Sequence, residues 1–373
     1  MEGVAGFVFI AATVSARNLY RRYHKPVLFF RPSSENIKRV KECTSLTKYE
    51  PPILLDYYGH VHSAVCHILR GLFQVELTIE RELLTLSDGG TVGLDWVDHK
   101  PKSSSTTPLV ILFHGICGNS TDSHVVYAAR RLQAEGFNVV TLISRGCGGV
   151  PLTTPASFNA ARRLDLKEGI SHISNCCPQA PLYGAGYSLG AGMLLNYVGH
   201  MGDESLLRRA LAVSPSWDFH KETSCFYWWS HYRLKDGLYR YSVVDNGEYL
   251  LNNPGNIDMD AVKIAKNVRQ FDHAAVVPVM GYADVDEYYT ESSACRVSTN
   301  ITTPTVALSS LDDPVCSAEG CPVSQEQLGP GLVVVQTKKG GHVSFMSGLL
   351  PTSRGWMDDV AVQWFADQEK EPV

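Results

Sequence analysis

Ser188, Asp313 and His342 are of the residue types that together perform nucleophilic catalysis. Ser188 lies between Gly186 and Gly190 in the run Gly-Tyr-Ser-Leu-Gly, a pattern typical of a serine on a tight turn from a strand into a helix. In such a site the histidine takes the proton of the serine hydroxyl, and a carboxylate on its other ring nitrogen stabilises the imidazolium. The chain order Ser, Asp, His therefore predicts acyl transfer through a covalent intermediate.

Two adjacent carboxylates, Asp312 and Asp313, compete for the role of the acid. In many hydrolases the acid is followed by one residue and then an apolar one, and Asp313-Pro314-Val315 fits that pattern. We therefore choose Asp313 as the partner of His342 and expect Asp312 to cap the loop, although the sequence leaves both open.

Two backbone amides are candidates for an oxyanion hole, those of Ile116 and Leu189. A His-Gly turn, His114-Gly115, directly follows an apolar run and brings the amide of Ile116 to the end of a predicted strand. Leu189 follows the predicted nucleophile and opens a helix. Two such amides directed at one developing oxyanion stabilise the transition state by about 3 kcal/mol or more. We expect the His114 side chain itself to be buried and to fix the loop.

The elements that must hold these residues alternate between buried strands and helices. Continuous apolar runs predict strands in a parallel sheet, and helical patterns fall between them. Two further strands around a Gly-rich turn precede this series. The predicted strands are 77–86, 91–97, 109–113, 137–143, 180–185, 211–214, 304–309 and 332–336, and the predicted helices include 122–135, 165–174 and 189–197. This order predicts an α/β-hydrolase fold with a mostly parallel, doubly wound sheet.

The alternation of predicted strands and helices is interrupted by one long segment, which divides the predicted core into two parts. Residues 75–215 form the first part of the core and residues 300–373 the second. Between them, residues 216–299 are rich in aromatic side chains and predict a mostly helical cap over the site. Residues 25–74 show no clean period and are expected to form an extension wrapped on the core.

The first 24 residues predict a membrane-anchor segment. Val4 to Ala16 is apolar and is followed by a basic cluster from Arg17 to Lys25. The apolar run is shorter than the roughly 20 residues that cross a bilayer comfortably. A short signal-anchor, an interfacial helix and a helix packed on the soluble part all remain open. We expect a single-pass anchor on an endomembrane such as the endoplasmic reticulum, with the side of the catalytic part open.

Composition argues against several other classes of function. A formal net charge of −5 gives no electrostatic case for binding nucleic acid. The ten cysteines are scattered, which favours reduced and packed thiols, and Cys316 and Cys321 lack the spacing of a zinc site. We expect no metal, no organic cofactor and no obligate protein partner. Whether the sequons at Asn119 and Asn300 carry glycans is open.

Several motifs together resemble the membrane-anchored α/β-hydrolase-domain proteins of the ABHD type. They are FHGICGNS, SRGCGG, GYSLGAG, DVDEYY, LDDP and GGH, and the likeness extends from about residue 50 to the end. The resemblance is to the branch of phospholipases and acylglycerol lipases. It implies that Ser188, Asp313 and His342 form the triad and that the substrate is a lipid ester, such as a monoacylglycerol, a medium-chain acyl ester or a phosphatidylcholine.

Two competing functions remain beside lipid ester hydrolysis. The first is transfer of the acyl group to an alcohol, since the chemistry differs only in the second nucleophile. A sister branch linked with acyltransferase activity carries an Asp five residues after the histidine, but here that position is Ser347. The second is a hydrolase fold that binds a ligand without catalysis, since a fold does not dictate a function.

Overall fold

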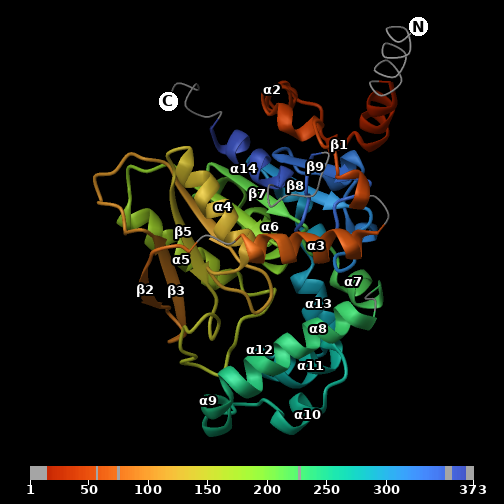
Figure 1. Cartoon of the computed structure of the whole chain (residues 1–373). Helices are drawn as coiled ribbons and strands as arrows, with labels where there is room; N and C mark the ends of the chain where they lie inside the picture. Colours follow the sequence, from red (N-terminus) through yellow and green to blue (C-terminus); the bar gives the residue numbers. More distant parts are fainter. Residues whose placement is uncertain (1–14, 56–57, 74–75, 226–227, 349–354, 367–373) are drawn as a thin grey trace, which may run out of the picture.

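The computed structural model describes residues 15–55, 58–73, 76–225, 228–348 and 355–366, with the side chains of 223–233 left aside. Within these residues one nine-stranded sheet forms the centre, in the order β1-β9-β8-β7-β6-β4-β5-β3-β2 (Figure 1). The strands from β4 to β9 are parallel. They are β4 (Leu109–Phe113), β5 (Asn138–Ile143), β6 (Leu182–Tyr187), β7 (Arg209–Val213), β8 (Thr305–Ser310) and β9 (Leu332–Thr337).

Antiparallel strands extend the sheet at both edges. The hairpin of β2 (Ile79–Thr85) and β3 (Thr91–Val97) joins β5 at one edge, and β1 (Val27–Phe30) joins β9 at the other. The central strands are almost wholly buried, which explains their continuous apolar sequences. The sheet is thus mostly parallel, as predicted, and β1 is a strand that the sequence analysis did not foresee.

Helices cover both faces of the sheet. The helices α4 (Ser123–Ala134) and α14 (Trp356–Ala366) pack against each other in one apolar core. The helices α5 (Arg163–Cys176) and α6 (Leu189–Met201) pack in the other. Helices on both faces of a mostly parallel sheet confirm the predicted doubly wound α/β architecture.

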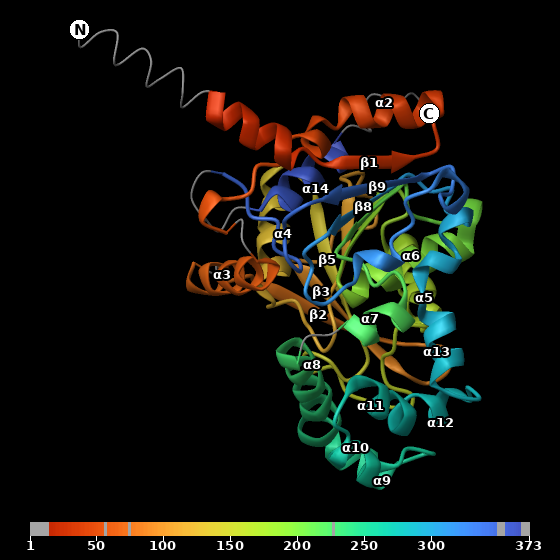
Figure 2. The ribbon, with the colours of Figure 1, turned by 90° about the vertical axis from the view of Figure 1, so that its right-hand side faces the viewer.

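The chain between β7 and β8 forms a group of helices that lies beyond the end of the sheet (Figures 1 and 2). They are α7 (Phe219–Cys225), α8 (Trp228–Tyr239), α9 (Gly247–Asn252), α10 (Met259–Ile264), α11 (Val268–Ala275), α12 (Val277–Met280) and α13 (Val285–Ser292), with a π-helical turn at Arg240–Asp245. That residues 216–299 act as a cap remains a prediction.

The region before β2 holds a helix over residues 15–24, then β1, α2 (Ser34–Glu42) and α3 (Gly59–Leu72). Short 3-10 turns lie at Thr44–Thr47, Ile53–Leu55, Gly202–Glu204, Ala294–Arg296, Ser298–Asn300, Ala318–Gly320 and Gln325–Gln327. Most of the predicted anchor, residues 1–14, lies outside the described residues. None of the helices formed by the described residues combines the length and the apolar composition needed to cross a bilayer.

Candidate active site

Ser188 stands at the sharp turn between β6 and α6. Its backbone has φ 54° and ψ −121°, a region that L-residues rarely occupy, and its N–H donates to Val213 O at 2.9 Å. The flanking glycines have a steric reason. A Cβ on Gly186 would lie 2.6 Å from Gly190 O, and one on Gly190 would collide with the carbonyls that end β4. The turn therefore tolerates no side chain at either position.

His342 and Asp313 meet Ser188 at the ends of neighbouring strands. The Ser188 hydroxyl lies 2.8 Å from His342 Nε2. On the other side of the ring, His342 Nδ1 lies 2.9 Å from Asp313 Oδ2 and 3.0 Å from Oδ1. The Asp313 carboxylate also accepts the N–H groups of Val315 and Cys316 at 2.8 and 2.9 Å. With these contacts Asp313 holds the ring with Nδ1 protonated and Nε2 free to accept the serine proton.

Asp312 points into the loop instead. Its Oδ1 accepts the Ser310 hydroxyl at 2.6 Å and the Gly341 N–H at 3.0 Å, so it ties the loop after β8 to the loop that carries His342. Lys339 Nζ lies 3.9 Å from its other oxygen. The geometry is that of a capping carboxylate.

The turn after β4 runs directly beside Ser188. A Cβ on Gly115 would lie 3.5 Å from Ser188 Cβ and 3.9 Å from Oγ. Leu189 is the first residue of α6, so its N–H has no partner within the helix. The amides of Ile116 and Leu189 thus belong to the two segments that flank the Ser188 hydroxyl, and their role as oxyanion donors stays a prediction.

His114 fixes this turn. The residue is buried, and burial lowers the pKa of its imidazole to about 4. The neutral ring donates from Nδ1 to Gly115 O at 2.6 Å and accepts the Ser144 N–H on Nε2 at 3.0 Å. Its side chain therefore joins the turn after β4 to the loop after β5.

An apolar pocket begins at Ile116 and Leu189 and extends between the core and the helices of residues 216–299. Its volume is about 40 Å³. The aromatic and aliphatic lining comes from Phe158 in the core and from α8, α11 and α13, with Leu238, Val268, Phe271 and Tyr288 among the lining residues. The lining is thus mostly apolar, and the space holds only a few water-sized groups.

Helix α3 supports the base from outside the core, which the sequence analysis missed. The His342 N–H donates to Ser63 Oγ at 2.8 Å, and Ser63 Oγ donates to Gly59 O at the same distance. The Met346 N–H donates to His62 Nε2 at 3.0 Å. The four residues that α3 buries, Gly59, His62, Cys66 and Arg70, recur at helical spacing, and that spacing is visible in the sequence. Because these residues are small or polar, hydrophobic periodicity did not reveal the helix.

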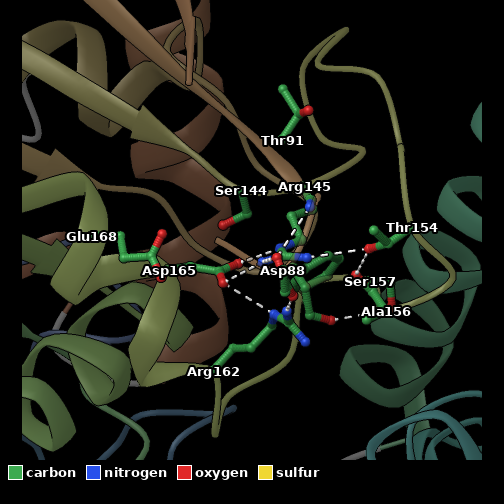
Figure 3. Close-up of polar contacts among 12 residues, drawn as sticks. Asp88, Thr91, Ser144, Arg145, Thr154, Ala156, Ser157, Arg162, Asp165 and Glu168 are labelled. Carbon is green, nitrogen blue, oxygen red and sulfur yellow. Dashed lines mark hydrogen bonds and ion pairs between the residues drawn. The ribbon is translucent and has the colours of Figure 1, made fainter. Parts of the chain in front are cut away.

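A network of two buried arginines, the buried Asp165 and the exposed Asp88 fixes the loop after β5 (Figure 3). Arg145 binds Asp165 through two nitrogens at 2.8 Å and Asp88 at 2.7 Å. Arg162 bonds to the same two carboxylates. The arginines, above all the hydrogen bond from Arg145, outweigh the desolvation of Asp88 and lower its carboxyl pKa to about 2. The Tyr241 hydroxyl donates to Arg145 O at 3.0 Å, so the network also anchors the region 216–299.

Two groups of side chains approach the spacing of metal ligands among the described residues, Glu82-His172-Cys176 and Asp313-Cys316-His342. In the first, Glu82 Oε2 already accepts Trp96 Nε1 at 2.9 Å and Lys100 Nζ at 2.8 Å. In the second, both nitrogens of His342 are engaged by Asp313 and Ser188. In both groups, ligand atoms are thus already engaged in hydrogen bonds within the protein.

Comparisons with known proteins agree with this geometry. The family model described as "alpha/beta hydrolase fold" matches residues 108–349. Phospholipase ABHD3 from Bos taurus and from Homo sapiens is each 30% identical over 292 residues, covering 76% of this chain and 70% of that protein. Monoacylglycerol lipase from Saccharomyces cerevisiae is 28% identical over 283 residues, 72% of this chain and 60% of that protein.

Among solved structures, Est1E from Butyrivibrio proteoclasticus, with ferulic acid bound, aligns with a TM-score of 0.50. It is 12% identical, and the alignment covers 78% of this chain and 100% of Est1E. At this level of identity the likeness shows a shared fold.

Proposed function

This chain belongs to the α/β hydrolase fold family, and from that premise we propose that it is a serine hydrolase that cleaves carboxylic esters of lipids. One observation carries the proposal: Ser188 Oγ, His342 and Asp313 form a continuous hydrogen-bonded relay at the ends of parallel strands. The relatives named phospholipase and monoacylglycerol lipase support an ester of a lipid as the substrate. Neither the head group nor the acyl chain length follows from these names.

In the proposed reaction His342 Nε2 takes the proton of Ser188 as Oγ attacks the ester carbon. The ester carbonyl oxygen becomes an oxyanion, and in this proposal the amides of Ile116 and Leu189 donate to it. The imidazolium, stabilised by Asp313, then protonates the leaving alcohol. A water molecule, deprotonated by His342, attacks the acyl-enzyme and releases the fatty acid with Ser188 restored.

Two other functions compete with this proposal. An alcohol in place of water in the second step would give acyl transfer, which the same residues support. A module that binds a ligand without catalysis would not need the relay. The intact relay and the strained backbone at Ser188 favour a working nucleophile.

Labelling with a fluorophosphonate probe tests the proposal. Detergent-extracted wild type should react at Ser188, and Ser188→Ala should stay unlabelled at an unchanged melting temperature. Folded wild-type protein that does not label would contradict the proposal and would favour the binding module. The ratio of fatty acid to transferred acyl product, measured with added glycerol, separates hydrolysis from acyl transfer.

A further inference from the structure

Helix α3 buries several small or polar residues, beside the partly buried Val65 and Leu69, and exposes apolar residues on its outer face. The face toward the protein carries Gly59, His62, Cys66 and Arg70. Arg70 is 1% exposed and binds Asp358 at 2.5 Å. The outer face carries Val61, Ala64, Ile68 and Leu72, which are exposed and follow one another at helical spacing. Because α3 buries Arg70 and exposes Ile68 and Leu72, its outer face is suited to an apolar environment.

Aromatic side chains lie at both ends of this stripe. Tyr58, just before α3, is 68% exposed and Phe73, just after it, is 63% exposed. The preceding 3-10 turn adds Ile53 and Leu54, which are also exposed. Tyr58 has an amphipathic ring and Phe73 an apolar one, and both kinds of ring are typical of helices that lie in the interfacial region of a bilayer.

The charge around the stripe suits an anionic lipid surface. Residues 59–72 contain no Asp or Glu, and neither do residues 15–34. The helix over 15–24 adjoins the turn at 53–55, because Arg17 and Arg21 both bind Glu50 and the Tyr20 hydroxyl donates to Pro51 O. Arg22 and Lys25 of this segment are exposed. Basic side chains beside an apolar stripe complement anionic head groups.

Helix α3 lies close to the loops that carry Asp313 and His342. It also lies on the same side of the molecule as the helix over residues 15–24. Figure 2 shows α3 and the helix over 15–24 on the same side, with α8 below them. The first turn of α3 touches both loops of the relay: a Cβ on Gly59 would collide with the backbone of Asp312, and Ser63 holds the His342 amide. Helix α3 thus lies between its own outer face and the loops that carry Asp313 and His342.

We propose that the outer face of α3 docks on an anionic lipid bilayer. Docking would hold the active site around Ser188 next to the bilayer that contains the lipid ester. The proposal rests on the proposed lipid hydrolase function and adds to the predicted N-terminal anchor a second contact with the bilayer. Docking by α3 would orient the catalytic part, which a flexible tether alone would not do.

The experiment compares two double variants of the full chain. Ile68→Ser with Leu72→Ser changes the α3 stripe, and Leu83→Ser with Leu206→Ser removes exposed leucines from β2 and from the loop before β7 as a matched control. Each protein is assayed on water-soluble p-nitrophenyl butyrate. Each is also assayed on vesicles of phosphatidylcholine and phosphatidylserine that carry a monoacylglycerol, with total fatty acid release as the readout.

The α3 variant should keep its rate on the soluble ester within twofold and lose tenfold or more of its rate on vesicles. The control should keep both rates. Unchanged vesicle hydrolysis by the α3 variant would overturn the proposal, and so would an equal fall on both substrates, since α3 would then act only through the triad. Sedimentation could also show that the wild type is a dimer and the α3 variant a monomer. That result would overturn the proposal, because the stripe would then bind a second copy of this chain.

Amide hydrogen exchange separates failure of docking from failure of the proposed function. If wild type hydrolyses neither substrate, the hydrolase proposal fails, and docking is judged by exchange of residues 59–72 with and without vesicles. Vesicles should slow exchange in α3 of the wild type and not in its double variant. Equal exchange in both proteins would overturn docking.

Discussion

Ser63 and His342 are joined by a hydrogen bond across 279 residues of sequence, from the His342 N–H to the Ser63 hydroxyl at 2.8 Å. The backbone on both sides of His342 is unusual, with φ 60° at Gly341 and 49° at Val343. The Val343 N–H donates to Ser214 Oγ at 3.0 Å. The backbone of the base is thus held by two serine hydroxyls, one from an N-terminal helix and one from the end of β7.

We expect Ser63→Ala to lower kcat about 10- to 100-fold with little change in KM, because the ring of His342 would shift relative to Ser188. Ser63→Thr keeps a hydroxyl and should restore most of the rate. Steady-state kinetics on a soluble ester measures both. A Ser63→Ala enzyme with normal kcat would show that His342 needs no support from α3.

The two neighbouring aspartates should respond differently to the same change. Asp313→Asn would favour the wrong tautomer of His342 and should lower kcat by about 10⁴. Asp312→Asn weakens only the loop hydrogen bonds to Ser310 and Gly341, so it should lower the free energy of unfolding by about 1 kcal/mol and kcat by less than about tenfold. Kinetics and urea denaturation of the pair decide the assignment, and the opposite ranking of kcat would make Asp312 the acid.

Two glycines near Ser188 should separate folding from catalysis. A Cβ on Gly190 meets the backbone of Phe113 and His114, so Gly190→Ala should reduce soluble folded protein severely. A Cβ on Gly115 has room, 3.9 Å from Ser188 Oγ, but fills space that the ester would need. Gly115→Ala should therefore fold with a normal melting temperature and lose activity. Full activity in Gly115→Ala would place the substrate elsewhere.

Stability should fall as the pH drops below neutrality, because His62 and His114 are buried as neutral rings. Burial lowers the pKa of each to about 4 in the folded chain, against about 6.5 when unfolded. Between these values the unfolded state binds more protons, so each histidine destabilises the fold by up to about 1.4 kcal/mol per pH unit as the pH falls. Both also accept a backbone N–H on Nε2, which protonation would forbid.

Urea denaturation at pH 7, 6 and 5 measures this dependence. In His62→Gln the new side chain is polar but does not titrate. The free energy of unfolding of this variant should therefore fall less steeply than that of the wild type over the same pH range. An identical slope in wild type and His62→Gln would mean that His62 is not held neutral in the folded chain.

The parallel core could be predicted because each of its elements carries its own local signal. Leu109–Phe113 is apolar throughout since both of its faces are buried, and its bounds agree with the predicted 109–113. Gly186 reflects a collision with Gly190 and Ala191, within a few residues of the chain, whereas Gly190 is required by the distant end of β4. Asp312 and Asp313 could not be separated in this way, because the direction of each side chain depends on a loop that meets His342 only in three dimensions.

The elements that escaped prediction depend on distant partners. The strand β1 has four residues, too few to show a period, and its pairing residues lie in β9. The helix α3 buries Gly59, His62 and Arg70, whose partners are the loop of His342 and Asp358. A periodicity analysis expects the buried face of a helix to be apolar, and here that face is polar.

The pairing of β1 with β9 has a consequence for biosynthesis. Val27–Phe30 is translated first among the strands, and its partners, Val333–Gln336, are translated last. During the synthesis of most of the chain, the apolar Val-Leu-Phe-Phe run therefore has no strand to join. Closure of this edge must therefore wait until β9 has been synthesised, and contacts of such long sequence separation form slowly. The Val27–Phe30 segment is thus expected to be among the last to reach its native pairing.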